Sequence, residues 1–199
     1  MPSPRDIPRV KQAWSKLNYD KLIVKYKPQW EAYAEAREFF LNHKEYTHLV
    51  ICADDLVIEL DDLDILLEWA ELYNVMDGVC GIDESQPNTL AIQPIGCNLS
   101  GNQPDLQKGA WIERKDTESN YQQVGHSGAA CRVIDRETFE LITFTGGNPN
   151  RDGWFDFGMT KELTKLGIPI MVNTSVYMDH LRTAQKPVNE YGYTLWIQR

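Results

Sequence analysis

The sequence lacks any apolar run long enough to cross a membrane, and no signal-peptide pattern precedes the predicted fold. We therefore expect a soluble protein without a transmembrane segment, located in the cytoplasm. Basic residues are also in the minority, with 20 Lys and Arg against 29 Asp and Glu and a net charge of −9. Because nucleic-acid binders usually carry a basic face, we do not expect nucleic acid as a partner.

Cysteine is scarce. The four cysteines (Cys52, Cys80, Cys97 and Cys131) lie far apart and form no Cys-x-x-Cys pair. Cys52 and Cys80 fall in apolar, strand-like runs, so we expect buried thiols there. A disulfide stays open as an alternative if the source is a hyperthermophile.

The chain has 199 residues, a length that suits one domain. Strand-like and helical patterns alternate in its first half. Strands are predicted over 22–26, 48–53, 75–82 and 90–95. A first helix is predicted over 29–43, and a second helix begins at Asp61-Asp62, which we expect to cap it. This order predicts a parallel sheet flanked by helices.

The second half is less regular. Residues 96–120 predict a long surface excursion, and residues 145–153 a loop rich in turn formers. A strand is predicted over 128–134, followed by a helix with Asp135 as its N-cap. A further helix is predicted from Asp156 to a C-cap at Gly167, and a final strand over 168–173.

An apolar strand that ends in two carboxylates, Asp54 and Asp55, is the most informative local feature. The carboxyl ends of parallel strands are where open α/β sheets bind ligands. Two carboxylates at such a place suit a hard cation such as Mg²⁺ or Mn²⁺, which takes oxygen ligands and often bridges to a substrate phosphate.

Four motifs in order carry a family resemblance. They are the acidic motif at 53–55, the Ser-Gly-Ala-Ala segment at 127–130, the Trp-Phe-Asp-Phe segment at 154–157, and His180 after the last strand. Over residues 20–183 the chain resembles a small GT-A glycosyltransferase of the large inverting family (family-2-like), and in particular a minimal archaeal-virus member. Ala53 departs from the pattern, because the family usually has Asp at that position.

The resemblance implies one GT-A domain over 1–199, Rossmann-like, with a mixed, mostly parallel sheet flanked by helices. Its nucleotide-binding half would span about 20–95, its acceptor half about 96–183, and a C-terminal extension 184–199. The implied activity moves a sugar from a nucleotide-diphosphate-sugar donor to a hydroxyl of a glycan, lipid or protein acceptor, with inversion. As a viral protein it would act in the host cytoplasm.

The resemblance also implies a site. Asp55 and His180 would hold Mn²⁺ or Mg²⁺, with Asp179 as a substitute for His180, and Asp54 and Arg37 would contact the donor. Imidazole as a ligand would favour Mn²⁺.

Asp156 takes the place of the general base, which removes the proton of the acceptor hydroxyl. Asp152 competes for that role. Ser127, Gly128 and Trp154 would bind substrate.

Two other functions remain open. A non-catalytic nucleotide- or sugar-binding module would share the fold. A serine hydrolase would use Ser127 with Asp152 or Asp156 and His180 in α/β-hydrolase order, but the segment before Ser127 is too polar for a central strand. A dehalogenase-type phosphatase is disfavoured, because Ala53 stands where its nucleophilic Asp belongs.

Overall fold

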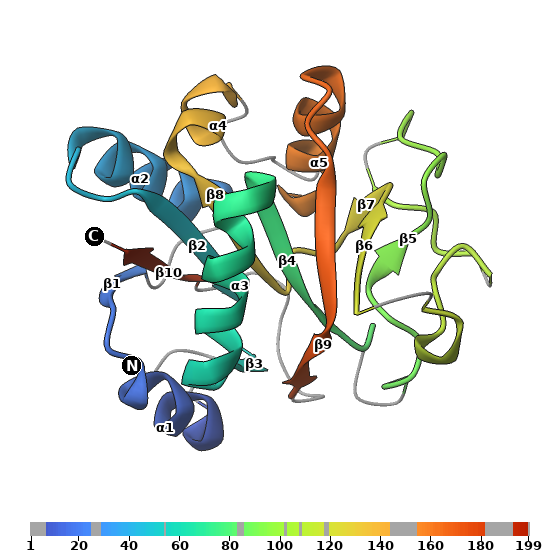
Figure 1. Ribbon diagram of the computed structural model, residues 1–199, viewed down its shortest axis with the longest axis horizontal. Helices are drawn as coiled ribbons and strands as arrows, with labels where there is room; N and C mark the ends of the chain where they lie inside the picture. Colours follow the sequence, from blue (N-terminus) through green and yellow to red (C-terminus); the bar gives the residue numbers. More distant parts are fainter. Residues whose placement is uncertain are drawn as a thin grey trace.

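The computed structural model describes residues 7–24, 29–53, 55–82, 86–101, 103–107, 109–117, 120–143, 155–181 and 193–198 (Figure 1). Its helices are α1 (Pro8–Lys16), α2 (Gln29–Asn42), α3 (Leu60–Tyr73), α4 (Arg136–Leu141) and α5 (Phe155–Lys165), with a 3₁₀ turn at Arg114–Asp116. None of the helices in these ranges combines the length and apolar content that crossing a membrane requires.

The strands are β1 (Asp20–Val24), β2 (His48–Ala53), β3 (Leu56–Val57), β4 (Val75–Cys80), β5 (Ile92–Gln93), β6 (Tyr121–Val124), β7 (His126–Ser127), β8 (Cys131–Asp135), β9 (Ile170–His180) and β10 (Tyr193–Gln198). The large sheet has the order β1-β10-β2-β8-β4-β9-β3, and β6 also pairs with β9. β5 and β7 form a small separate sheet.

The sheet is mixed, as expected, but the prediction that it is mostly parallel was wrong. Only β4 and β9 pair in parallel within the described strands, and the other pairs are antiparallel. The pairings make β1, β2, β4 and β9 run in one direction, as helical crossovers require. Two strands of opposite direction separate them, because β10 lies between β1 and β2, and β8 between β2 and β4.

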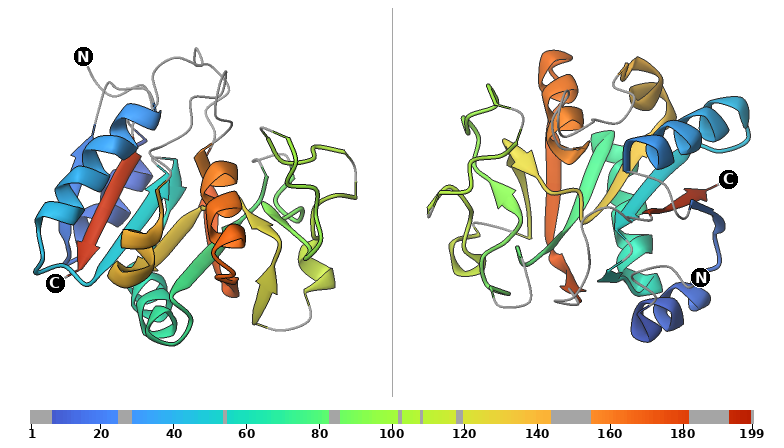
Figure 2. Two further views of the ribbon diagram at one scale, coloured as in Figure 1. Left: turned by 90° about the horizontal axis from the view of Figure 1, so that it is seen from above. Right: turned by 180° about the vertical axis from the view of Figure 1, so that it is seen from behind.

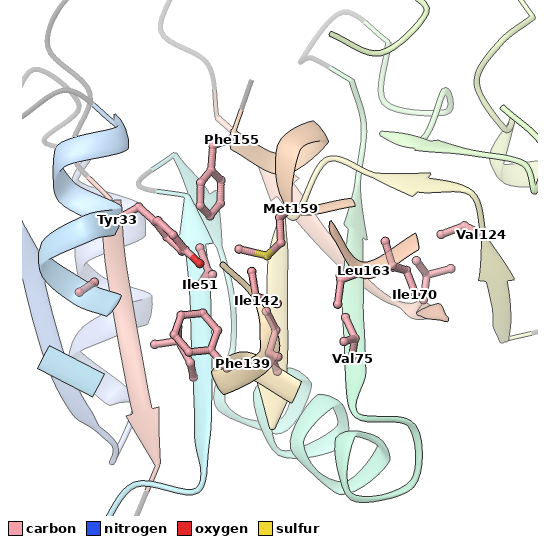
Figure 3. Packing of buried hydrophobic residues seen from close by; sticks show 14 of the residues in the cluster. Tyr33, Ile51, Val75, Val124, Phe139, Ile142, Phe155, Met159, Leu163 and Ile170 are labelled. Atoms are coloured by element: carbon pink, nitrogen blue, oxygen red, sulfur yellow. The ribbon is translucent and has the colours of Figure 1, made fainter. Parts of the chain in front are cut away.

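Helices cover both faces of the sheet (Figures 1 and 2). Along β2, Leu49 and Ile51 enter one core cluster and Val50 and Cys52 the other, so both faces of this strand are buried. The first cluster packs under α2, α4 and α5, with Tyr33, Phe139 and Met159 among its members (Figure 3). The second packs under α3.

Local signals were the most reliable. Asp135 caps α4 by accepting a hydrogen bond from the Thr138 amide at 2.6 Å, and α5 ends before Gly167, whose φ is +71°. Cys52 and Cys80 are buried thiols, as predicted. Asp61 does not cap α3, however, because the helix begins one residue earlier and places this carboxylate in its first turn.

Two elements near the ends of the chain were not predicted. Helix α1 begins at Pro8, a residue that suits the first turn, and Ile7 precedes it as the N-cap. Residues 193–198, expected in a C-terminal extension, form β10 inside the large sheet. The described residues between 96 and 117 form no strand, and no helix other than the 3₁₀ turn, and they lie with β5 and β7 beyond the β6 edge (Figure 1).

Candidate active site

Asp55 and His180 meet at the end of the sheet although 125 positions separate them. The His180 Nε2 lies 3.3 Å from the Asp55 Oδ2, and the Asp55 carboxylate is almost fully buried. The chain turns back after β2, and the short strand β3 pairs with the end of β9, with Leu56 opposite His180. The amide of Leu181 donates to the Asp55 carbonyl at 2.8 Å, which fixes the approach of the two segments.

The orientation of the His180 ring is set by Gly81, the residue that follows β4. Its Nδ1 lies 3.0 Å from the Gly81 carbonyl oxygen, which only accepts, so Nδ1 carries a proton and Nε2 faces Asp55. Burial alone would lower the pKa of His180, but the hydrogen bond to Asp55 and the nearby Cys80 thiol raise it to about 10. His180 and Asp55 therefore form an ion pair at neutral pH.

Asp179 does not share this arrangement. Its carboxylate forms an ion pair with the Arg9 guanidinium of α1, at 2.6 Å, and is half exposed. Asp179 thus holds α1 against the end of β9. His180, and not its neighbour, is the residue that faces Asp55.

Asp156 lies at the second position of α5, and its side chain is 19% exposed. Burial raises the pKa of this carboxyl to about 6, while the Phe157 amide, which donates to Oδ1 at 2.9 Å, and the Arg132 guanidinium oppose the shift. A carboxylate with such a pKa is ionised at neutral pH and is a stronger base than an ordinary aspartate.

A buried ion pair lies close to Asp156. The Arg132 guanidinium in β8 donates to both carboxylate oxygens of Asp77 in β4, at 2.7–3.1 Å, and neither side chain is exposed. Arg132 also lies within hydrogen-bonding range of the Ser127 carbonyl, at 3.4 Å. The pair places a fixed positive and a fixed negative charge close enough to alter the pKa of Asp156.

His126 completes this second group. It lies in β7, is fully buried, and its Nε2 is 3.7 Å from the Asp156 Oδ2. Its Nδ1 is 3.1 Å from the Thr160 hydroxyl, one turn along α5. Burial and the Arg132 charge lower the pKa of His126 to about 3, so the ring is neutral.

β4 connects the two groups. Asp77 on this strand belongs to the group around Asp156, and the carbonyl of Gly81, just after the strand, orients His180. Four residues of strand correspond to about 13 Å. Both groups are therefore organised by one buried strand.

The Ser-Gly-Ala segment lies beside Asp156. A Cβ added at Gly128 would lie 3.3 Å from the Ala91 Cβ and 3.8 Å from the Asp156 Oδ2, so the glycine allows a close approach to Ala91 next to the carboxylate. The Ser127 hydroxyl is buried and accepts a hydrogen bond from the Ala129 amide. Ala129 itself has a positive φ of +49°. Ser127 thus supports the turn in this structure, and its substrate contact stays a prediction.

The remaining predicted residues are not drawn together by the described contacts. The Arg37 guanidinium donates to the Ile142 carbonyl at 2.8 Å and lies over the Phe139 ring, so it joins α2 to the end of α4. Its role in donor binding stays untested. Asp54, Asp152 and Trp154 lie outside the described residues.

Sequence reasoning did not pair His126 with Asp156 and overlooked the Asp77–Arg132 pair. A signal for the pair exists, because each strand carries one charge within its buried run, Asp77 in β4 and Arg132 in β8, and the two charges are of opposite sign. Charges in buried strands are usually paired. For His126 no spacing pattern points to Asp156, since the contact depends on how β7 packs against α5.

No protein-family model matches the chain, and no curated protein matches it significantly. Among solved structures, the crystal structure of A197 from STIV is similar, with a TM-score of 0.50 and 19% sequence identity, covering 83% of this chain and 73% of that chain. At this identity the similarity shows a shared fold alone.

Proposed function

We propose that the protein is a metal-dependent glycosyltransferase of the GT-A type, which moves a sugar from a nucleotide-diphosphate donor to an acceptor hydroxyl with inversion. Asp55 and His180 carry this proposal, because an acidic strand end and a late histidine are brought within 3.3 Å of each other by separate segments. The family resemblance assigns metal binding to these same two residues.

The donor atoms fit Mn²⁺ or Mg²⁺. Metal-binding histidines usually donate their other ring N–H to a carbonyl or carboxylate, and the His180 Nδ1 faces the Gly81 carbonyl in this way. Loss of the Nε2 proton would leave a nitrogen ligand beside a carboxylate oxygen. Among the described residues no cluster of three or more His, Cys, Asp or Glu side chains could hold a metal, so diphosphate and water oxygens would supply further ligands.

Asp156 would act as the general base. With its pKa near 6, the carboxylate is ionised at neutral pH and accepts the acceptor hydroxyl proton as that oxygen attacks the anomeric carbon. When bound at Asp55 and His180, Mn²⁺ or Mg²⁺ would stabilise the negative charge on the diphosphate leaving group. Gly128 lies beside the Asp156 Oδ2, and the acceptor hydroxyl would approach the carboxylate along this glycine.

Calorimetry of Mn²⁺ and nucleoside diphosphates tests the proposal. We expect Mn²⁺ to raise the affinity for UDP or GDP, and Asp55→Ala to abolish the increase. Asp179→Asn is the matched control, because this neighbouring carboxylate is paired with Arg9 and should leave the metal effect unchanged. Equal affinity with and without Mn²⁺ would exclude the metal role.

Catalysis needs a separate measurement. Incubation with a panel of nucleotide sugars should release free sugar slowly in the wild-type protein, and Asp156→Asn should stop the release. If donors bind in a metal-dependent way but no donor is consumed with any acceptor or with water, the protein is a binding module and not a transferase.

A further inference from the structure

The contacts of His126 define where its single ring proton lies. The ring is fully buried between the Trp111 and Phe157 rings, whose centroids lie 6.1 and 5.4 Å away. Its Nδ1 is hydrogen-bonded to the Thr160 hydroxyl, at 3.1 Å. Its buried Nε2 has no hydrogen-bond partner among the described residues, and Asp156 Oδ2 lies 3.7 Å from it.

Two neutral tautomers are conceivable. If Nδ1 carried the proton, the lone pair of Nε2 would face the ionised carboxylate of Asp156, which is repulsive. If Nε2 carries it, the Thr160 hydroxyl donates to Nδ1 and the Nε2–H points toward a carboxylate oxygen. The second arrangement satisfies Nδ1 and places an attractive N–H, in place of a repulsive lone pair, toward the carboxylate.

We propose that His126 is a positioning residue for Asp156: its neutral ring carries the proton on Nε2, is held in that tautomer by Thr160, and directs this N–H at the Asp156 Oδ2. The catalytic meaning of this contact depends on the proposed transferase function. The 3.7 Å separation exceeds a hydrogen bond, and a shift of under about 1 Å would form one. Such hydrogen bonds are often long in unliganded enzymes and shorten when substrate binds.

Charges on neighbouring strands support this assignment. Arg132 in β8 and Asp77 in β4 are the charged groups that affect both His126 and Asp156. Arg132 and burial disfavour a second proton on His126. The ring can therefore donate to the carboxylate but does not take a proton from it, so a proton removed from an acceptor hydroxyl stays on Asp156.

The tautomer can be observed directly in the wild-type protein. The ¹⁵N–¹H correlation spectrum of the His126 ring, at pH 7.5, should show a proton on Nε2 and an unprotonated Nδ1. A proton on Nδ1 would overturn the proposal. This measurement needs no substitution and no substrate.

Two variants test the effect on Asp156. His126→Gln retains an N–H donor at a similar distance along the side chain, whereas His126→Leu removes it. By ¹³C NMR of the carboxyl group, we expect the pKa of Asp156 to rise by about one unit in His126→Leu and to stay within about half a unit in His126→Gln. An equal rise in both variants, or none in either, would contradict the proposal.

These readouts separate the contact from the function. If the tautomer and the pKa changes are as expected but no sugar is transferred, the proposed function fails and the His126–Asp156 contact stands. If sugar is transferred and the pKa of Asp156 does not respond to His126→Leu, the transferase stands and His126 has no positioning role.

Discussion

Asp156→Asn should stabilise the protein at neutral and alkaline pH. The pKa of this carboxyl rises from 3.8 to about 6, chiefly because it is buried, so folding opposes its ionisation. Relative to the unfolded chain, the stabilising contribution of the protonated carboxyl is fully present below pH 3.8 and is lost as the pH rises through 6. Two pKa units correspond to about 3 kcal/mol.

Asparagine cannot ionise and retains an oxygen that accepts from the Phe157 amide. The difference in unfolding free energy between Asp156→Asn and wild type should therefore grow by about 3 kcal/mol between pH 3.5 and pH 8. For a chain of this length that corresponds to a Tm difference of roughly 6–12 °C. Urea unfolding across this pH range measures the free energies directly.

Asp61→Asn is the matched control. Asp61 is also the second residue of its helix, α3, but it is exposed. Its replacement should lower the free energy of unfolding by at most about 1 kcal/mol, because the interaction with the helix dipole is weaker without the charge. A pH-independent difference for Asp156→Asn, or an equal response of both variants, would refute a buried, destabilising carboxylate at position 156.

Three further predictions concern the same region. Asp77→Leu alone should lower the free energy of unfolding, measured with urea, by about 3–5 kcal/mol. Combining it with Arg132→Met should restore most of this loss. Equal losses in the single and the double variant would contradict a buried ion pair. Gly128→Ala should raise KM for the acceptor, because the added Cβ would lie 3.8 Å from the Asp156 Oδ2, where the acceptor hydroxyl would approach. An unchanged KM would exclude this role. The kcat/KM for transfer should rise with pH through about 6, as Asp156 loses its proton, and a profile flat across pH 5–8 would exclude Asp156 as the base.

The local structure of this chain was largely predictable. The helix at α5, its end before Gly167 and the Asp135 cap of α4 depend on residues within a few positions of one another. The strand β2 and the acidic pair after it were visible for the same reason, since an unbroken apolar run marks a strand that is buried on both faces.

Strand pairing was not predictable to the same degree. The alternation of strands and helices in the first half correctly implies that β1, β2 and β4 run in one direction, but it does not reveal which strands are neighbours. The strand predicted at 90–95 is reduced to β5 and belongs to the small separate sheet. β8 and β10 are inserted by contacts that span much of the chain, such as the pairing of Thr194 with Cys52. A periodic pattern records whether a residue is buried, and not which strand lies beside it.

The candidate site divides in the same way. Local periodicity and turn chemistry were enough to predict that a buried strand ends just before Asp55 and that a helix begins near Asp156. The contacts of His180 with Asp55 and of His126 with Asp156 became visible only in the folded chain. The physical reason is that burial, tautomer and pKa depend on groups that the packing of distant segments brings within a few ångströms.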